Sequence, residues 1–301
     1  MSEAVASARP GTLRAFGSLV KLSHTVFGLP FALASTLLAH RFATAHGGLG
    51  LDALRVLWIV LAFTGARAAA MGFNRIVDRR FDAANPRTAT RELPAGVMSL
   101  RAAWSLTLLS AAVFVGASAA LGWLPALLSP ACLVVLLGYS YFKRFSWSSH
   151  LVLGLALALA PGGAWIAVTG GFAGATAPLL LMLAVATWVA GFDVLYALQD
   201  QDFDRAAGLH SIPARFGTVG ALVISAALHV VTLLALALLH LHAGLGLAHA
   251  AGLLVIAVIL VAEHVIVRPG DLSRIGKAFF DLNGWVSLGY LAAVAIDLAL
   301  A

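Results

Sequence analysis

Long apolar runs separated by short polar stretches make up most of the chain. A helix needs roughly 20 mostly apolar residues to cross the hydrocarbon core of a bilayer. Nine runs approach or exceed that length, at about 25–44, 52–72, 102–121, 124–142, 150–169, 176–196, 218–241, 243–267 and 276–298. This pattern predicts an all-α, polytopic membrane protein with about nine transmembrane helices. We expect residues 1–301 to form a single integral-membrane domain, with 1–20 as a short cytoplasmic N-terminal segment.

The composition agrees with a membrane protein. Of the 301 residues, 61% are hydrophobic and only 11% are charged, whereas soluble domains are about a quarter charged. The single cysteine, Cys132, excludes an intrachain disulfide and a cysteine-based metal site. The ten histidines show no common ligand spacing, so we interpret them as residues of the membrane interface.

The positive charge is explained by topology. The net charge is +6, which in a soluble protein would suggest a nucleic-acid partner. Here most Lys and Arg residues fall in alternate polar segments, and cytoplasmic loops of membrane proteins collect these residues. We therefore expect no nucleic-acid partner and a multi-pass protein of the inner (plasma) membrane. The cytoplasmic segments are then 1–24, 73–101, 143–149, 197–217 and 268–277.

Two of these cytoplasmic segments carry regularly spaced polar residues. In the first, Asn74, Asp78 and Asp82 are four residues apart, so that a helix places them on one face. Arg67 lies seven residues earlier on the same face. A buried arginine there calls for a carboxylate partner, either from a substrate or from the protein itself.

In the second segment and the helix end that leads into it, Asp193, Asp200 and Asp204 follow one another at steps of seven and four. Carboxylates near membrane depth are costly unless they face a cavity or a partner. Two such stripes at the same depth indicate a divalent-cation site, and oxygen ligands with room for water and phosphate suit Mg²⁺. The alternative, ordinary solvated loop charges, explains one stripe better than two.

Several motifs resemble the UbiA superfamily of intramembrane aromatic prenyltransferases. Residues 74–82 match its NxxxDxxxD motif, residues 85–96 its NPRT and LPxG loop, and residues 193–204 its DxxYAxQDxxxD motif. Residues 139–143 match a YxxxK motif. The sequence of residues 21–32 resembles that of the 4-hydroxybenzoate polyprenyltransferase-like branch. The resemblance implies nine transmembrane helices around a central cavity.

The resemblance also implies a function. We expect Mg²⁺-dependent transfer of a polyprenyl group from polyprenyl diphosphate to an aromatic carboxylate, 4-hydroxybenzoate, in ubiquinone biosynthesis, at an active site that faces the cytoplasm. Prenylation of 1,4-dihydroxy-6-naphthoate in menaquinone biosynthesis is the alternative within the superfamily. A membrane transporter is the alternative from another class.

The roles implied for single residues follow the motifs. Lys143 would stabilise the leaving diphosphate, Asp193 would orient the acceptor's hydroxyl or accept the ring proton, and Arg67 would bind the acceptor's carboxylate. The expected metal ligands are Asn74, Asp78, Asp82, Asp200 and Asp204. The expected catalytic residues are Asp78, Asp82, Asp200, Asp204, Lys143 and Asp193. The expected substrate-binding residues are Arg67, Asn74, Tyr139, Arg79, Arg144 and Tyr196.

Overall fold

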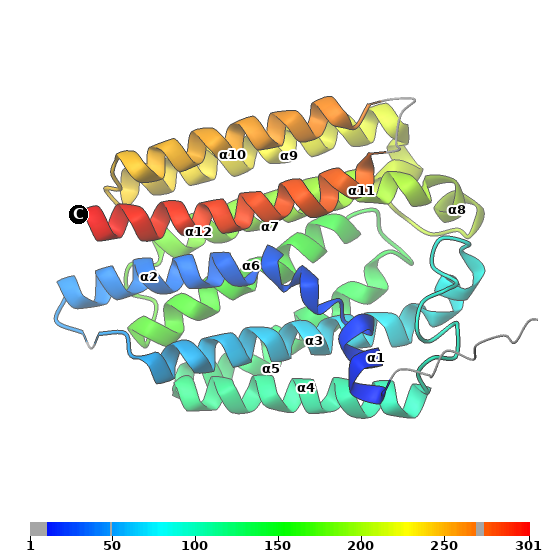
Figure 1. Cartoon of the computed structure of the whole chain (residues 1–301), viewed down its shortest axis with the longest axis horizontal. Helices are drawn as coiled ribbons and strands as arrows, with labels where there is room; N and C mark the ends of the chain where they lie inside the picture. Colours follow the sequence, from blue (N-terminus) through cyan, green and yellow to red (C-terminus); the bar gives the residue numbers. More distant parts are fainter. Residues whose placement is uncertain (1–10, 49, 269–273) are drawn as a thin grey trace, which may run out of the picture.

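The computed structural model describes residues 11–48, 50–268 and 274–301, with the backbone alone for 22–24 and 277–279. The first ten residues of the expected N-terminal segment therefore lie outside the described part. Helices account for nearly all of what is described (Figure 1). They are α1 (Thr12–Leu19), α2 (Leu29–Ala45), α3 (Ala53–Ala84), α4 (Leu100–Leu121), α5 (Trp123–Phe142), α6 (Ser149–Thr169), α7 (Thr176–Ala197), α8 (Gln201–Ala206), α9 (Ile212–His242), α10 (Leu247–Ile266), α11 (Ile275–Lys277) and α12 (Asn283–Leu300).

Nine helical segments in the described part of the chain are long and apolar enough to cross a membrane. This confirms the predicted all-α fold, and most predicted runs match their helices to within a few residues. Three segments are longer than predicted, because α3 continues to Ala84, the sixth span continues through a 3₁₀ turn at Leu198–Asp200 to Ala206, and α9 begins at Ile212. Both carboxylate stripes therefore lie on helical backbone.

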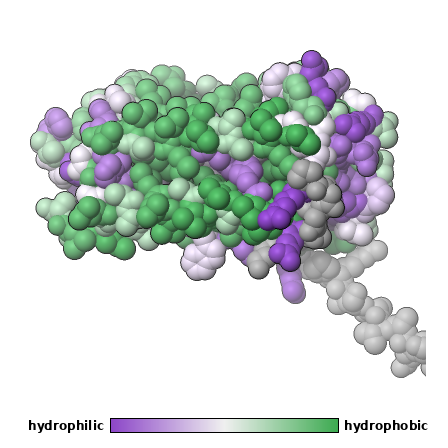
Figure 2. Space-filling model, turned by 90° about the horizontal axis from the view of Figure 1, so that it is seen from above, coloured by the Kyte–Doolittle hydropathy of each residue, from purple (hydrophilic) through white to green (hydrophobic). Residues whose placement is uncertain are grey.

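The helices form an elongated bundle with an apolar flank. Helices that follow one another along the chain pack as antiparallel pairs, α3 on α4 and α6 on α7. Helix α7 also packs on α9. Figure 2 shows hydrophobic residues covering most of the visible face, and hydrophilic residues gathered mainly at one end. We call this the polar end; it carries α1, α8 and the connections 85–99 and 143–148. A bilayer covers such a flank, so its exposed leucines and valines need no protein partner.

The core of the bundle lies around α7. Trp188 is fully buried, and its ring centroid is 5.1 Å from that of Phe31, which stacks on Tyr290 at 5.0 Å. The indole Nε1 of Trp188 donates a hydrogen bond of 2.8 Å to Oδ1 of Asn283. A polar group at membrane depth must be satisfied within the protein, and this bond meets that need.

The α6–α7 contact depends on a glycine. A Cβ atom added at Gly154 would lie 2.1 Å from the backbone oxygen of Ala186, a distance that only backbone movement can relieve. Gly163 on the same helix has no atom within 4 Å of such a Cβ. At Gly154 the backbones of the two helices therefore approach closely, as is common in membrane bundles.

We predict that Gly154→Ala lowers the melting temperature of the detergent-solubilised protein, because overpacking costs about 1–3 kcal/mol and outweighs the better helix propensity of alanine. Gly163→Ala is the matched control and should leave the melting temperature unchanged or raise it. Equal melting temperatures for the two variants would contradict the close approach.

Candidate active site

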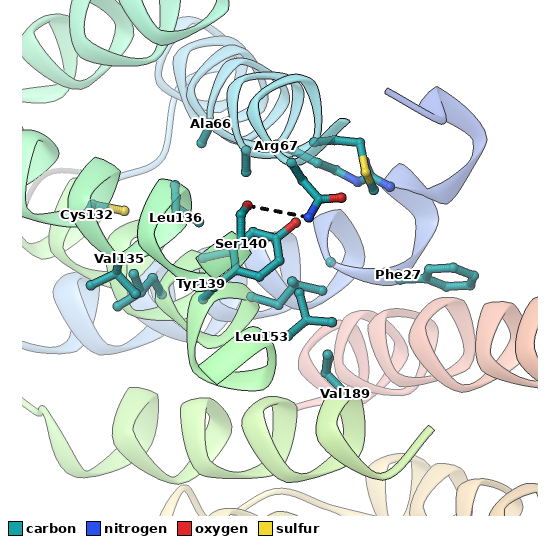
Figure 3. A pocket seen from close by; sticks show the side chains of 18 of the residues that line it. Phe27, Ala66, Arg67, Cys132, Val135, Leu136, Tyr139, Ser140, Leu153 and Val189 are labelled. Atoms are coloured by element: carbon teal, nitrogen blue, oxygen red, sulfur yellow. Dashed lines mark hydrogen bonds between the residues drawn. The ribbon is translucent and has the colours of Figure 1, made fainter. Parts of the chain in front are cut away.

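A cavity of about 1070 Å³ opens at the polar end and continues between the helices. Its deeper wall is apolar and includes Cys132, Leu136, Leu153 and Val189 (Figure 3). Its mouth is lined by carboxylates of α3, of the 3₁₀ turn after α7 and of α8, together with cationic side chains. The arrangement joins a charged head-group site to an apolar chamber.

The first stripe faces this mouth from α3. Asn74 donates a hydrogen bond of 2.9 Å from Nδ2 to Asp78, whose other oxygen accepts one of 3.2 Å from Arg144. Asp82, one turn further, is 7% exposed and accepts a bond of 2.6 Å from Arg91. Arg91 lies in the 85–99 connection, and burial together with the charge of Arg75 lowers its pKa from the ordinary value.

Asp200 of the second stripe is held by the same connection. Arg87 donates from Nε to Oδ1 at 2.8 Å and from Nη2 to Oδ2, a bidentate pair, and Asn85 adds a bond of 2.9 Å. Arg87 also donates to the hydroxyl of Tyr196 at 2.9 Å. Burial alone lowers the pKa of Arg87, but the hydrogen bonds and charge of Asp200 outweigh burial and raise that pKa above its ordinary value.

Asp204 is the most buried carboxylate of the site. It lies on α8 with no exposed surface, and Nζ of Lys143 is 2.7 Å from its Oδ1. Lys143 caps the end of α5, and its backbone oxygen accepts a hydrogen bond of 2.7 Å from the amide of His210. The 3₁₀ turn at Leu198–Asp200 separates α7 from α8 within the second stripe, yet Asp200 and Asp204 both line the cavity.

The donor set of the two stripes fits a hard divalent cation. All five predicted ligands line the cavity or its mouth and offer oxygen atoms. Oδ2 of Asp82 is buried without a hydrogen-bond partner among the described residues, and the Arg75 guanidinium is 3.9 Å away. No three His, Cys, Asp or Glu side chains of the described part converge on one point. Mg²⁺ needs no such cluster, because it is commonly held by one or two carboxylates with water and substrate phosphates.

Asp193 lies deeper in the cavity wall, about 10 Å along the helix from Asp200 by the rise per residue. Its Oδ2 is 2.7 Å from Nδ1 of His150, which is 3% exposed and comes from the first turn of α6. The other imidazole nitrogen, Nε2, accepts a hydrogen bond of 3.3 Å from the backbone amide of Ile212. Our interpretation of the histidines as interface residues is therefore wrong for His150.

Arg67 and Tyr139 also line the cavity. In Figure 3, Tyr139 projects from α5 into the cavity and Arg67 extends from α3 toward the segment that precedes α2. Arg67 donates to the backbone oxygens of Val20 at 3.2 Å and Lys21 at 3.3 Å. Lys21 has a φ of 51°, the left-handed region, so Arg67 braces a strained corner while its guanidinium lines the cavity.

Arg79 is the one expected site residue that does not line the cavity. Its Nη1 donates to the backbone oxygen of Ile76 on its own helix at 3.0 Å. Asn85, Arg87, Arg91 and His150 lie at the site although none of them was predicted as a site residue. The first three fall inside the loop motif at 85–96, which was the signal available for them; His150 had none.

The comparisons with known proteins agree with this geometry. The UbiA prenyltransferase family model matches residues 30–286. The chain belongs to the UbiA prenyltransferase family. A 4-hydroxybenzoate octaprenyltransferase from Xanthomonas euvesicatoria pv. vesicatoria (strain 85-10) is 32% identical over 259 residues, 83% of each chain. The expected family and enzyme class are thereby confirmed, and the chain is a UbiA-type aromatic prenyltransferase of the membrane.

Solved structures show the same fold. The apo structure of a UbiA homolog from Aeropyrum pernix K1 matches with a TM-score of 0.82 and 33% identity, covering 91% of this chain and 98% of that one. A UbiA homolog from Archaeoglobus fulgidus bound to GPP and Mg²⁺ matches with a TM-score of 0.70 and 21% identity, over 95% and 99%. The second likeness shows the fold alone.

We predict that Arg87→Gln lowers kcat/KM for prenyl transfer at least about tenfold, because loss of one partner of a largely buried charge pair costs more than 1.4 kcal/mol. Arg79→Gln is the matched control, with the same charge change outside the cavity, and should stay within about threefold of the unmodified protein. Steady-state rates in membranes measure both. Similar losses in the two variants would show that net charge, and not the Asp200 pair, matters.

Proposed function

We propose that this UbiA-type enzyme transfers a prenyl group from a prenyl diphosphate to an aromatic hydroxycarboxylate, with 4-hydroxybenzoate as the acceptor. The observation that carries the proposal is that residues of both carboxylate stripes line one cavity, whose deeper wall is apolar. The Xanthomonas relatives named 4-hydroxybenzoate octaprenyltransferase support the choice of acceptor.

The diphosphate head group would lie at the polar end. Asn74, Asp78 and Asp82 on one side and Asp200 with Asp204 on the other would hold Mg²⁺, since all five offer oxygen atoms to the cavity. A UbiA homolog of the same fold was solved bound to GPP and Mg²⁺. Mg²⁺ bound there supplies charge stabilisation as the allylic C–O bond breaks. Lys143, Arg144 and the two loop arginines, already within bonding distance of these carboxylates, would donate to the outer phosphate oxygens.

The prenyl tail would occupy the apolar part of the cavity, and the aromatic acceptor the wall between Arg67 and Asp193. A guanidinium suits a carboxylate, so Arg67 would bind the acceptor's carboxylate with the donors not used on Val20 and Lys21. Tyr139 and Tyr196 would flank the acceptor and the diphosphate respectively, since both line the cavity. These placements leave the acceptor's hydroxyl near Asp193.

The reaction is an electrophilic aromatic substitution. The allylic C–O bond breaks and its electron pair stays on the diphosphate, while a ring carbon ortho to the hydroxyl forms a new C–C bond to the prenyl group. A proton leaves the acceptor, and Asp193 is the carboxylate placed to accept it. The products are the prenylated acceptor and diphosphate.

The polar end would face the cytoplasm of a bacterial inner membrane. The segments 73–101, 143–149 and 197–217 at that end hold ten of the 19 lysines and arginines, which favours the cytoplasmic side. This orientation gives a water-soluble acceptor access to the mouth of the cavity.

The test is prenyl transfer by membranes that contain the protein, with geranyl diphosphate and either 4-hydroxybenzoate or 1,4-dihydroxy-6-naphthoate. We expect product from 4-hydroxybenzoate with Mg²⁺ and none with EDTA, since the oxygen-only ligand set needs a hard cation. Product from the naphthoate alone would keep the enzyme class and replace the acceptor. No product from either, in folded protein, would overturn the proposed acceptor class.

Asp200→Ala and Asp202→Ala form the internal control of this assay. Asp200 is buried and lines the cavity, whereas Asp202 is two residues away and exposed. Transfer should be lost in Asp200→Ala and kept in Asp202→Ala.

We predict that Arg67→Ala raises the KM of the aromatic acceptor about tenfold or more and leaves the KM of the prenyl diphosphate within about twofold, because a lost carboxylate pair costs at least 1.4 kcal/mol of acceptor binding. The two constants are measured separately in the same membranes. If both rise together, the role of Arg67 is to brace Val20 and Lys21.

A further inference from the structure

One carboxylate of the two stripes differs from the other four in its partner. Asp78, Asp82, Asp200 and Asp204 each lie within 3.2 Å of a lysine or arginine nitrogen. Among the described residues, the partner of Asp193 is instead the imidazole of His150. Four of the carboxylates are thus neutralised by permanent cations, and the deepest one is not.

The hydrogen bonds of His150 fix its protonation state. The backbone amide of Ile212 always donates, so Nε2 of His150 must be the acceptor and carries no proton. The remaining ring proton is then on Nδ1 and is donated to Oδ2 of Asp193. The imidazole is neutral in this arrangement, and its tautomer is set by the backbone.

The amide of Ile212 is available for a structural reason. Ile212 is the first residue of α9, where backbone N–H groups have no partner within the helix. Ser211 caps this end by accepting from the amide of Ala214 at 3.2 Å, which leaves the Ile212 amide to His150. Three elements, α6, α7 and α9, thus meet at one oriented carboxylate.

We propose that His150 is a positioning residue that holds Asp193, with its charge uncompensated by a cation, as the base for the acceptor's phenolic proton. The side chain of Asp193 keeps 24% of its surface exposed, on the cavity wall, while Oδ2 is bound to His150. Oδ1 therefore remains to accept the proton. Among the described residues Asp193 forms no ion pair with lysine or arginine, which separates it from the other four carboxylates of the two stripes.

The proton balance follows from this assignment. The phenolic O–H bond of the acceptor breaks, its proton moves to Oδ1 of Asp193, and the oxygen's electron pair enriches the ortho carbon that forms the C–C bond. This step gives a neutral dienone, whose ring C–H bond then breaks and passes its proton to water or to the released diphosphate. The ring becomes aromatic again as a phenolate, and Asp193 returns its proton to that oxygen, so that one proton is released in all. His150 gains and loses no proton, since Nε2 stays bound to the Ile212 amide. This inference rests on the proposed transfer to a hydroxylated aromatic acceptor.

Three substitutions test it. In His150→Asn, the side-chain amide nitrogen takes nearly the place of Nδ1 and keeps the donor to Asp193. In His150→Gln, the polar group takes nearly the place of Nε2, and in His150→Ala both are lost. We expect kcat to fall at least about tenfold in the Ala and Gln variants, with the KM of the diphosphate unchanged. We expect His150→Asn to regain most of that loss.

A second acceptor distinguishes the positioning role of His150 from a merely structural one, because a structural role would leave the ratio of kcat values the same for both acceptors. A fluorine beside the hydroxyl of 4-hydroxybenzoate makes the phenol more acidic and less dependent on a base. The ratio of kcat in the unmodified protein to that in His150→Gln should therefore shrink with the fluorinated acceptor. The ratio of kcat in the unmodified protein to that in Asp193→Asn should also shrink with the fluorinated acceptor.

Two results would overturn the positioning role: kcat in His150→Gln equal to that of the unmodified protein, or equal losses in folded Asn and Gln variants with the same ratio for both acceptors. The failure of the proposed function is distinct, because the unmodified protein itself would then prenylate neither acceptor. Melting temperatures of the solubilised variants identify any that fail to fold, and the Asn and Gln pair stays informative if His150→Ala is one of them.

Discussion

The cost of charge in a low-dielectric medium governs this structure. Five carboxylates stand at or near membrane depth along α3, α7 and α8, and each is met by a nitrogen donor from a different part of the chain. A charge left there without a partner would destabilise the fold by several kcal/mol. The carboxylates are therefore as much the reason for the 85–99 loop conformation as they are a binding site, because its arginines reach back to them.

The depth of each carboxylate is matched by the kind of partner it has. At the mouth, where water enters, Asp78 and Asp200 pair with arginines that can rearrange around an anionic ligand. Deeper, Asp193 pairs with a neutral imidazole that is itself fixed by backbone. The arginine pairs therefore lie at the mouth and the neutral His150 imidazole lies deeper. This order suits a charged diphosphate held at the mouth and a less polar acceptor activated further in.

Much of this architecture could be predicted from the sequence, because hydrophobic length and helical spacing are local properties. The nine spans and the two polar stripes follow from them directly. The partners do not, since Asn85 and Asp200 are 115 residues apart and only the fold brings them together. Arg79 and Arg87 both lie within motifs, so the sequence does not distinguish them. In the structure Arg79 does not line the cavity, whereas Arg87, in the loop, does. His150 carries no motif at all.

The division of the cavity into a charged mouth and an apolar chamber has a consequence for divergence within the family. Its deep wall is built from side chains such as Leu136, Leu153 and Val189, which differ in volume but not in charge. Exchanges among such residues reshape the chamber and leave every ion pair at the mouth intact. Selection on the length or shape of an apolar substrate can thus proceed through neutral, volume-changing steps, while the head-group chemistry is inherited unaltered.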